Sequence, residues 1–312
     1  MAGEPNSVFL ELFFKTLKNN RFKSPIILIA SDKIVKLQMK FFKQNYKINL
    51  INPNNLENIN LKKNNINLVN VNYNSSKAFE KMSKKSKKYI FNSFEIAFKL
   101  INSGLTNKLI NGPISKRNLF NNKYLGVTEY ISKFFSINNY AMLIYNKSLS
   151  VSPLTTHLPI KLVAKKINKK MIIDKILLLE KFYLEKLKFK PRIAITGLNP
   201  HCESIDKFNE DTKIIYPAVK FLKKVGVNIN GPFPADTLFV KANRRRFDLI
   251  IGTYHDQVLG PIKTLYEYDA INITVGLPFI RVSPDHGPNQ TMVGKNLSNI
   301  LSLKRSIQFL DN

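Results

Sequence analysis

The stretch Asp248-Leu-Ile-Ile-Gly-Thr-Tyr-His-Asp-Gln257 decides the fold class of this 312-residue chain. Its first seven residues form a β-rich run that predicts a strand. The polar triplet His255-Asp-Gln257 follows at once, and the loops after strands of an open α/β sheet meet at its ligand crevice. The stretch therefore predicts an α/β protein with functional side chains at strand ends.

Short β-rich runs alternate with longer amphipathic stretches elsewhere in the chain, as expected for parallel strands joined by crossover helices. Strands are predicted over Pro25–Ala30, Lys108–Asn111, Ala141–Tyr145, Arg192–Thr196 and Asp248–Tyr254. Helices are predicted over Ser76–Ser103, Leu158–Leu187 and Thr212–Val225. There is no internal repeat and no Gly/Ser linker, so we expect two lobes in one compact unit.

The formal charge of +28 raises the question of a nucleic-acid partner. Most of the basic residues are Lys and only eight are Arg, and Trp is absent. Lys has A/T-rich codons, so an AT-rich genome explains the excess. A protein that reads nucleic acid is expected to favour Arg. We expect no nucleic-acid partner, and a basic binding protein on an enzyme scaffold remains an alternative.

The single cysteine, Cys202, fits a reducing compartment. No apolar run approaches the roughly 18 residues of a membrane span. The first residues include Glu4 and Glu11 and have no basic region, which is untypical of a signal peptide. We therefore expect a cytoplasmic protein without a membrane partner.

His157, His201 and His255 each follow a predicted strand closely. Three imidazoles at the strand ends could bind a divalent metal and leave coordination positions open for a substrate. Any one of them alone is more simply a loop residue bonded to the backbone. Their shared placement favours a metal site.

Other polar segments could meet an anionic substrate. Asn111-Gly-Pro-Ile-Ser-Lys116 follows a strand and opens a helix, so its backbone and Lys116 could contact an anion, although an ordinary turn would look the same. Lys263 precedes the run Asn272–Arg281, which begins with an amide and ends with a cation. Such groups near a metal suit a phosphorylated or carboxylated substrate.

Taken together, these segments resemble the 4-hydroxythreonine-4-phosphate dehydrogenase family of pyridoxal phosphate biosynthesis. The matching pieces, in family order, are Gly3-Glu-Pro5, Asn111–Lys116, Gly126–Glu129, Thr155–Pro159, Gly197–His201, Gly231–Phe239, Tyr254–Gln257, Asn272–Arg281 and Asp285-His-Gly287. Most are weak singly, but the ordered series is specific and spans nearly the whole chain.

The resemblance implies a two-lobed, isocitrate-dehydrogenase-like α/β fold with helices packed on mostly parallel sheets. The active site would lie in the cleft between the lobes. Lobe one would comprise about residues 1–125 and 285–312, and lobe two about residues 126–284, with the metal site and the interface of a homodimer.

The family's functional residues carry over onto matching positions of this chain. The metal ligands would be His157, His201 and His255, contributed by both subunits. The substrate-binding residues would be Thr128, Lys263, Asn272 and Arg281. One divalent ion per site is implied, which could be zinc, magnesium, manganese or cobalt. Asp236 and Asp256 could act behind the ligands or accept protons, and no catalytic residue is assigned.

In such a family, the secondary alcohol of 4-phosphooxy-L-threonine is oxidised by hydride transfer to NAD(P)+. The β-keto acid then loses CO2 to give 3-amino-2-oxopropyl phosphate. A divalent ion at the hydroxyl would lower its pKa during hydride transfer. No G-x-G-x-x-G dinucleotide-binding fingerprint is present. The assignment of NAD(P)+ as the oxidant therefore rests on the resemblance, which makes Asp285-His286-Gly287 the candidate cofactor loop.

The chain departs from the family pattern at Val127, where the family usually has His. Valine offers a phosphate neither a hydrogen bond nor a charge, so the nearest alternative is a related oxidative decarboxylase of 4-phospho-D-threonate or 4-phospho-D-erythronate. A decayed enzyme that binds metal without turnover is a further alternative. Relatives also carry a strand before Gly3-Glu-Pro5, so either the start is assigned too late, which we favour, or one strand is missing.

Overall fold

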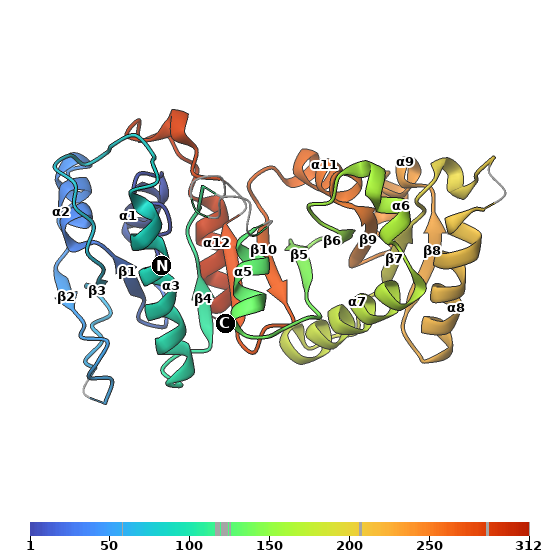
Figure 1. Ribbon diagram of the computed structural model, residues 1–312, viewed down its shortest axis with the longest axis horizontal. Helices are drawn as coiled ribbons and strands as arrows, with labels where there is room; N and C mark the ends of the chain where they lie inside the picture. The colour runs from blue at the N-terminus through green and yellow to red at the C-terminus, as the bar shows by residue number, and fades with distance from the viewer. Residues whose placement is uncertain are drawn as a thin grey trace. The chain divides into compact units, whose positions relative to one another are not determined.

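The computed structural model describes residues 1–57, 59–115, 119, 124, 126–205, 208–284 and 287–311. The chain divides into two units, of which the first comprises Met1–Ile131 with Pro278–Asn312 and the second Ser132–Leu277. Both contain parallel strands joined through helices, so the predicted α/β class is confirmed (Figure 1). None of the helices in the described part is long and apolar enough to cross a membrane.

The first unit contains a three-stranded parallel sheet and the two parallel strands β4 (Lys108–Ile110) and β11 (Ile280–Pro284), which pair with each other. The sheet has the order β1 (Ile27–Ala30), β3 (Ile66–Asn70), β2 (Ile48–Leu50). The helices that lie wholly in its described part are α1 (Phe9–Asn19), α2 (Asp32–Phe41), α3 (Ser86–Asn102), the 3-10 turn η5 (Gln290–Met292) and α12 (Leu301–Leu310). Helix α3 contacts β1, and α12 contacts both strands of the pair.

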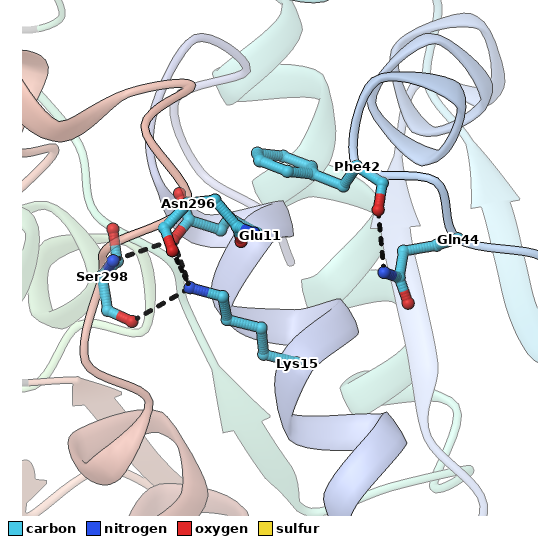
Figure 2. Close-up of polar contacts among 6 residues, drawn as sticks. All are labelled: Glu11, Lys15, Phe42, Gln44, Asn296 and Ser298. Carbon is cyan, nitrogen blue, oxygen red and sulfur yellow. Dashed lines mark hydrogen bonds and ion pairs between the residues drawn. The ribbon is translucent and has the colours of Figure 1, made fainter.

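An ion pair with a buried carboxylate attaches α1 to the segment that precedes α12. Lys15 Nζ donates to Glu11 Oε1 at 2.8 Å and to the carbonyl of Asn296 at 2.8 Å (Figure 2). The Ser298 N–H donates to the same Glu11 oxygen at 2.8 Å. The side chain of Glu11 is 1% exposed, so these donors compensate for the removal of its charge from water.

The first two residues lie between the edges of β1 and β4. The Met1 amino group donates to the carbonyl of Ile110 at 2.8 Å, and Gly112 N–H donates to the carbonyl of Met1 at 2.9 Å. Ala2 N–H donates to the carbonyl of Ile29 on β1 at 3.0 Å. These bonds follow the pattern of a parallel ladder. Next to Met1, both strands line a cavity of about 390 Å³.

The second unit contains one mixed sheet. Its strand order in the described part is β10 (Ile271–Val275), β5 (Ala141–Tyr145), β6 (Ser150–Thr155), β9 (Leu249–Tyr254), β7 (Ile193–Thr196) and β8 (Ile229–Phe233). Strand β5 is antiparallel to both neighbours, and β6, β9, β7 and β8 are parallel. The carboxyl ends of these four strands therefore lie at one edge.

Helices cover this sheet because its strands are apolar on both faces. Ile250 packs in a buried cluster with Val258 and Ile262 of α11 (His255–Tyr266). Leu249 and Ile251 alternate with Ile250, so they point to the opposite face, and they are also fully buried.

The remaining helical elements are η1 (Ile160–Leu162), α6 (Val163–Lys166), α7 (Lys169–Phe182), η2 (Tyr183–Leu187), η3 (Pro200–Cys202), η4 (Asp211–Ile215), α8 (Tyr216–Lys224), α9 (Ala235–Leu238) and α10 (Lys241–Arg244). Helix α5 (Val127–Phe134) contains residues of both units.

All five predicted strands are confirmed: Ala141–Tyr145 matches β5 at both ends, and the other four differ by one or two residues at one end. The helix predicted over Ser76–Ser103 is wrong in its first ten residues, since α3 begins only at Ser86. The helix predicted over Leu158–Leu187 is broken before α7, where Asn168 is extended and its side chain caps the new helix through Met171 N at 2.9 Å. The helix predicted from Thr212 begins as the π-helical turn η4.

Candidate active site

Three histidines follow three adjacent parallel strands of the second unit. His255 comes directly after β9, His157 lies two residues after β6, and His201 lies five residues after β7. Register pairs Thr155 with Tyr254, so β6 and β9 end at the same level. The topology thus brings the predicted metal ligands to one edge of the sheet. Ligands of open α/β sheets bind at this edge, outside the carboxyl ends of the strands.

Two of these histidines are neighbours in space. The ring centroids of His157 and His255 are 6.1 Å apart, and both side chains are half-buried. Two imidazoles bound to one tetrahedral zinc ion have centroids about 5 Å apart, so a small side-chain movement would let both rings reach one ion.

The ring orientation of His255 is set by the next residue. His255 Nδ1 lies 2.6 Å from Asp256 Oδ1. This contact leaves Nε2 as the ring nitrogen that can bind a metal, and a carboxylate behind a histidine ligand is a common way to orient it and to raise its basicity. Asp256 therefore lies behind a predicted ligand, in the position that one of the two roles left open by the sequence requires.

His201 is exposed and does not join the pair within the same chain. Among the described residues, no three His, Cys, Asp or Glu side chains are grouped closely enough to share an ion. His201 adopts φ 55° and ψ 14°, and Cys202 follows with φ 62°. The left-handed region is unfavourable for residues with a β-carbon, so this loop is held in a strained conformation.

Two predicted substrate residues of the second unit lie away from the strand ends. Asn272 shares a row of the sheet with Ile144 and Val151, four residues before the row of Thr155. That offset corresponds to about 13 Å along a strand. Lys263 lies eight residues after His255 on α11, about 12 Å along the helix. Among the described residues, none is a hydrogen-bond partner of the buried Oδ1 of Asn272.

Arg281 and Thr128, the predicted substrate residues of the first unit, are in contact. Arg281 Nη1 donates to Thr128 Oγ1 at 3.0 Å, and Arg281 Nε donates to Asn111 Oδ1 at 2.7 Å. Arg281 is only 3% exposed, and burial lowers the pKa of its guanidinium to about 10, while the Glu129 carboxylate favours the charged form. The group is therefore a buried cation at neutral pH, suited to a phosphate or carboxylate.

Asn111 is a site residue that the sequence did not single out by its side chain. Its segment drew attention through its backbone and Lys116, and Lys116 lies outside the described residues. The same holds for Asp285 and His286 of the candidate cofactor loop. The signal for Asn111 was its place directly after β4, at a strand end.

Comparison with known proteins places these features in a family. Residues 21–310 match the family described as pyridoxal phosphate biosynthetic protein PdxA. The 4-hydroxythreonine-4-phosphate dehydrogenase of Sulfurihydrogenibium sp. (strain YO3AOP1) is 35% identical over 98% of this chain and 94% of its own. The D-threonate 4-phosphate dehydrogenase of Pectobacterium atrosepticum is 34% identical over 59% of this chain and 58% of its own.

The fold also matches a solved structure over nearly its full length. The crystal structure of 4-hydroxythreonine-4-phosphate dehydrogenase from Klebsiella pneumoniae superposes with a TM-score of 0.83 at 26% identity, covering 99% of this chain and 95% of the other.

Proposed function

Because the chain belongs to the pyridoxal phosphate biosynthetic protein PdxA family and is thus an oxidoreductase, we propose that it oxidises 4-phosphooxy-L-threonine with NAD(P)+ in a metal-dependent reaction. The product would be the 3-oxo acid, which decarboxylates to 3-amino-2-oxopropyl phosphate in pyridoxal phosphate biosynthesis. The observation that carries this proposal is the His157–His255 pair at the ends of β6 and β9.

His157, His201 and His255 would hold one divalent ion per active site. The ion would supply Lewis acidity at the reacting hydroxyl and at the ketone formed from it. Asp256 would keep the His255 ring in the orientation that points Nε2 to the ion. Imidazole ligands favour zinc or cobalt, with magnesium and manganese as the alternatives.

Arg281, held by Asn111 and Thr128, would bind the phosphate or carboxylate of the substrate through its planar fork. Lys263 would supply a second cation. The buried amide oxygen of Asn272, which has no partner in the described part of the chain, would accept a hydrogen bond from the substrate's ammonium or hydroxyl group.

The proposed assembly is a homodimer with the active site at its interface, in which His201 completes the pair of the partner subunit. Support comes from the exposure of His201 and from apolar side chains that follow it. Ile205 is fully exposed, and Phe208 and Tyr216 are 54% and 56% exposed. Such a group of exposed apolar side chains is typical of an interaction surface.

We place the enzyme in the cytoplasm, with a small phosphorylated substrate and with neither nucleic acid nor membrane as a partner. The single cysteine and the preponderance of Lys over Arg support this placement. NAD+ and NADP+ both remain candidates for the oxidant.

The test is NAD(P)H formation, followed by absorbance, from 4-phosphooxy-L-threonine with and without a chelator. Turnover that the chelator abolishes and that added zinc or cobalt restores is expected. Turnover that is insensitive to the chelator would refute the metal-dependent mechanism. Absence of turnover with every metal tested would refute the activity.

The second candidate function is oxidation of 4-phospho-D-threonate, favoured by Val127 at the start of α5 and by the Pectobacterium relative. The side chain of Val127 places no hydrogen-bond donor beside Thr128. Both substrates are therefore assayed side by side with the Val127→His variant. A preference of the parent chain for the threonate, moved towards the amino acid by the histidine, would support this second candidate.

A further inference from the structure

The side chain of Gln257 connects the segments that carry His255 and His201. Gln257 is the third residue of α11, two after His255. Its Oε1 accepts hydrogen bonds from Thr253 N at 2.7 Å, Thr253 Oγ1 at 2.8 Å and Thr196 Oγ1 at 2.7 Å. Its Nε2 donates to the carbonyl of Gly197 at 2.7 Å.

These partners fix the amide in one orientation. Thr196 and Thr253 are fully buried at the ends of β7 and β9, and three of their donor groups, including the Thr253 N–H, meet the oxygen. The amide nitrogen meets an acceptor, so a flipped amide would place like groups against each other. Gln257 thus joins the first turn of α11 to the first residue of the His201 loop.

Asp211 holds the next two residues of that loop. Its carboxylate accepts from Leu198 N at 2.7 Å, from Asn199 N at 3.1 Å and from Asn199 Nδ2 at 2.9 Å. Asp211 is 1% exposed, and buried bonds between a carboxylate and N–H groups are stronger than bonds between neutral groups. The backbone of residues 197–199 is therefore bonded from two sides.

The loop needs this support because it is strained. His201 and Cys202 are consecutive residues with positive φ, and each such residue costs roughly 1 kcal/mol. A loop under this strain relaxes unless its surroundings determine its conformation. The bonds from Gln257 and Asp211 act on residues 197–199, which are separated from the strained pair only by Pro200.

We infer that Gln257 and Asp211 are positioning residues that preorganise His201 as a metal ligand and couple its loop to the turn that carries His255. This inference rests on the proposed metal-dependent function. It adds two residues that would never touch the ion or the substrate and whose loss would still weaken metal binding.

The variant Gln257→Glu separates this role from simple stabilisation. Glutamate retains the acceptor for both threonines, and its negative charge suits the N-terminus of α11. It loses the amide N–H that donates to the Gly197 carbonyl. The carboxylate oxygen that replaces the donor would face the Gly197 carbonyl, so we expect the melting temperature to fall by roughly 5 °C. The positioning role predicts in addition faster amide hydrogen exchange at Leu198 and Asn199 and an apparent Kd for Co2+ raised about tenfold.

The matched control is Gln44→Glu in the first unit, where Gln44 Nε2 donates to the carbonyl of Phe42 at 2.9 Å (Figure 2). It removes the same kind of bond away from the loop, so Co2+ affinity and exchange at Leu198 are expected to stay unchanged. A second variant, Asp211→Asn, turns an amide N–H towards the loop donors and is expected to reproduce both effects of Gln257→Glu.

The readouts distinguish the possible failures. Unchanged exchange at Leu198 and Asn199 in both loop variants would overturn the inference, as would faster exchange with unchanged Co2+ affinity. If the parent protein itself binds no Co2+, the proposed metal-dependent function fails first, and the positioning role fails with it. Retention of the parent Co2+ affinity in Gln257→Glu would also overturn it, because the donor to Gly197 would then be dispensable.

Discussion

The α-amino nitrogen of Met1 lies 2.8 Å from the carbonyl oxygen of Ile110, in the place that a backbone N–H occupies in a parallel ladder. The next bond of that ladder is present, since Gly112 N–H reaches the carbonyl of Met1. Met1 is 6% exposed, and burial lowers the pKa of its amino group to about 5. A group that is normally charged is therefore buried where a neutral amide would fit.

This burial predicts a pH dependence of stability. The pKa of the amino group is 8.0 in the unfolded chain and about 5 in the folded one, so folding between these values releases a proton. Lowering the pH from about 8 to about 5 therefore lowers the free energy of unfolding, by up to about 4 kcal/mol from this group. Above about pH 8 the amino group is neutral in both states, so it no longer changes the free energy of unfolding.

Acetylation of Met1 isolates the effect, because an acetylated nitrogen does not ionise. Urea unfolding of acetylated and unmodified protein, with Met1 verified by mass, is compared at about pH 6 and about pH 9. We expect the acetylated form to gain about 3 kcal/mol relative to the unmodified form at the lower pH. An equal difference at both pH values would contradict the prediction.

The cavity beside Met1 predicts that an added strand would stabilise the first unit. It is lined by Ile27–Ile29 and Lys108–Ile110. Strands β1 and β4 belong to different sheets, and among the described strands each has a partner on one side only. Four apolar β-branched residues placed before Met1 would extend the ladder in its existing register. We expect a gain on the order of 3 kcal/mol from new backbone bonds and apolar burial.

A four-residue Gly-Ser extension is the control, since it has the same length but little apolar surface. Chemical denaturation of the two proteins checks the prediction. Equal stability of the two extended proteins would show that the cavity does not accept a strand.

The predicted strands and strand-end histidines could be inferred from the sequence because both depend on local patterns. β-Branched runs identify β7 and β9, and His255 follows its strand directly. The roles of Gln257 and Asp211 could not be inferred in this way. Gln257 bonds to a residue 60 positions away, and nothing in its neighbourhood distinguishes it from an ordinary polar side chain. The break before α7 was not predicted, because the helical pattern of apolar residues continues through Ile167 without an interruption.

Arg281→Lys tests the anion site of the first unit. Lysine keeps the charge but lacks the fork that spans Asn111 and Thr128. We expect KM for the phosphorylated substrate to rise at least tenfold, about 1.4 kcal/mol, while KM for NAD(P)+ stays within about twofold. Steady-state kinetics check this, with Arg305→Lys on α12 as the control. A rise in both KM values would indicate general damage to the unit.

Mixing of inactive variants tests whether the metal site is shared between subunits. If His157 and His255 of one chain are completed by His201 of the other, then dimers formed from His201→Ala and His255→Ala chains contain one intact site. Random exchange of subunits then restores about a quarter of the parent activity. The mixture of His157→Ala and His255→Ala is expected to stay inactive, since both residues belong to the same pair. Activity is measured after dissociation and reassociation of each mixture. A first mixture as inactive as the second would mean that each chain supplies all three ligands to its own ion.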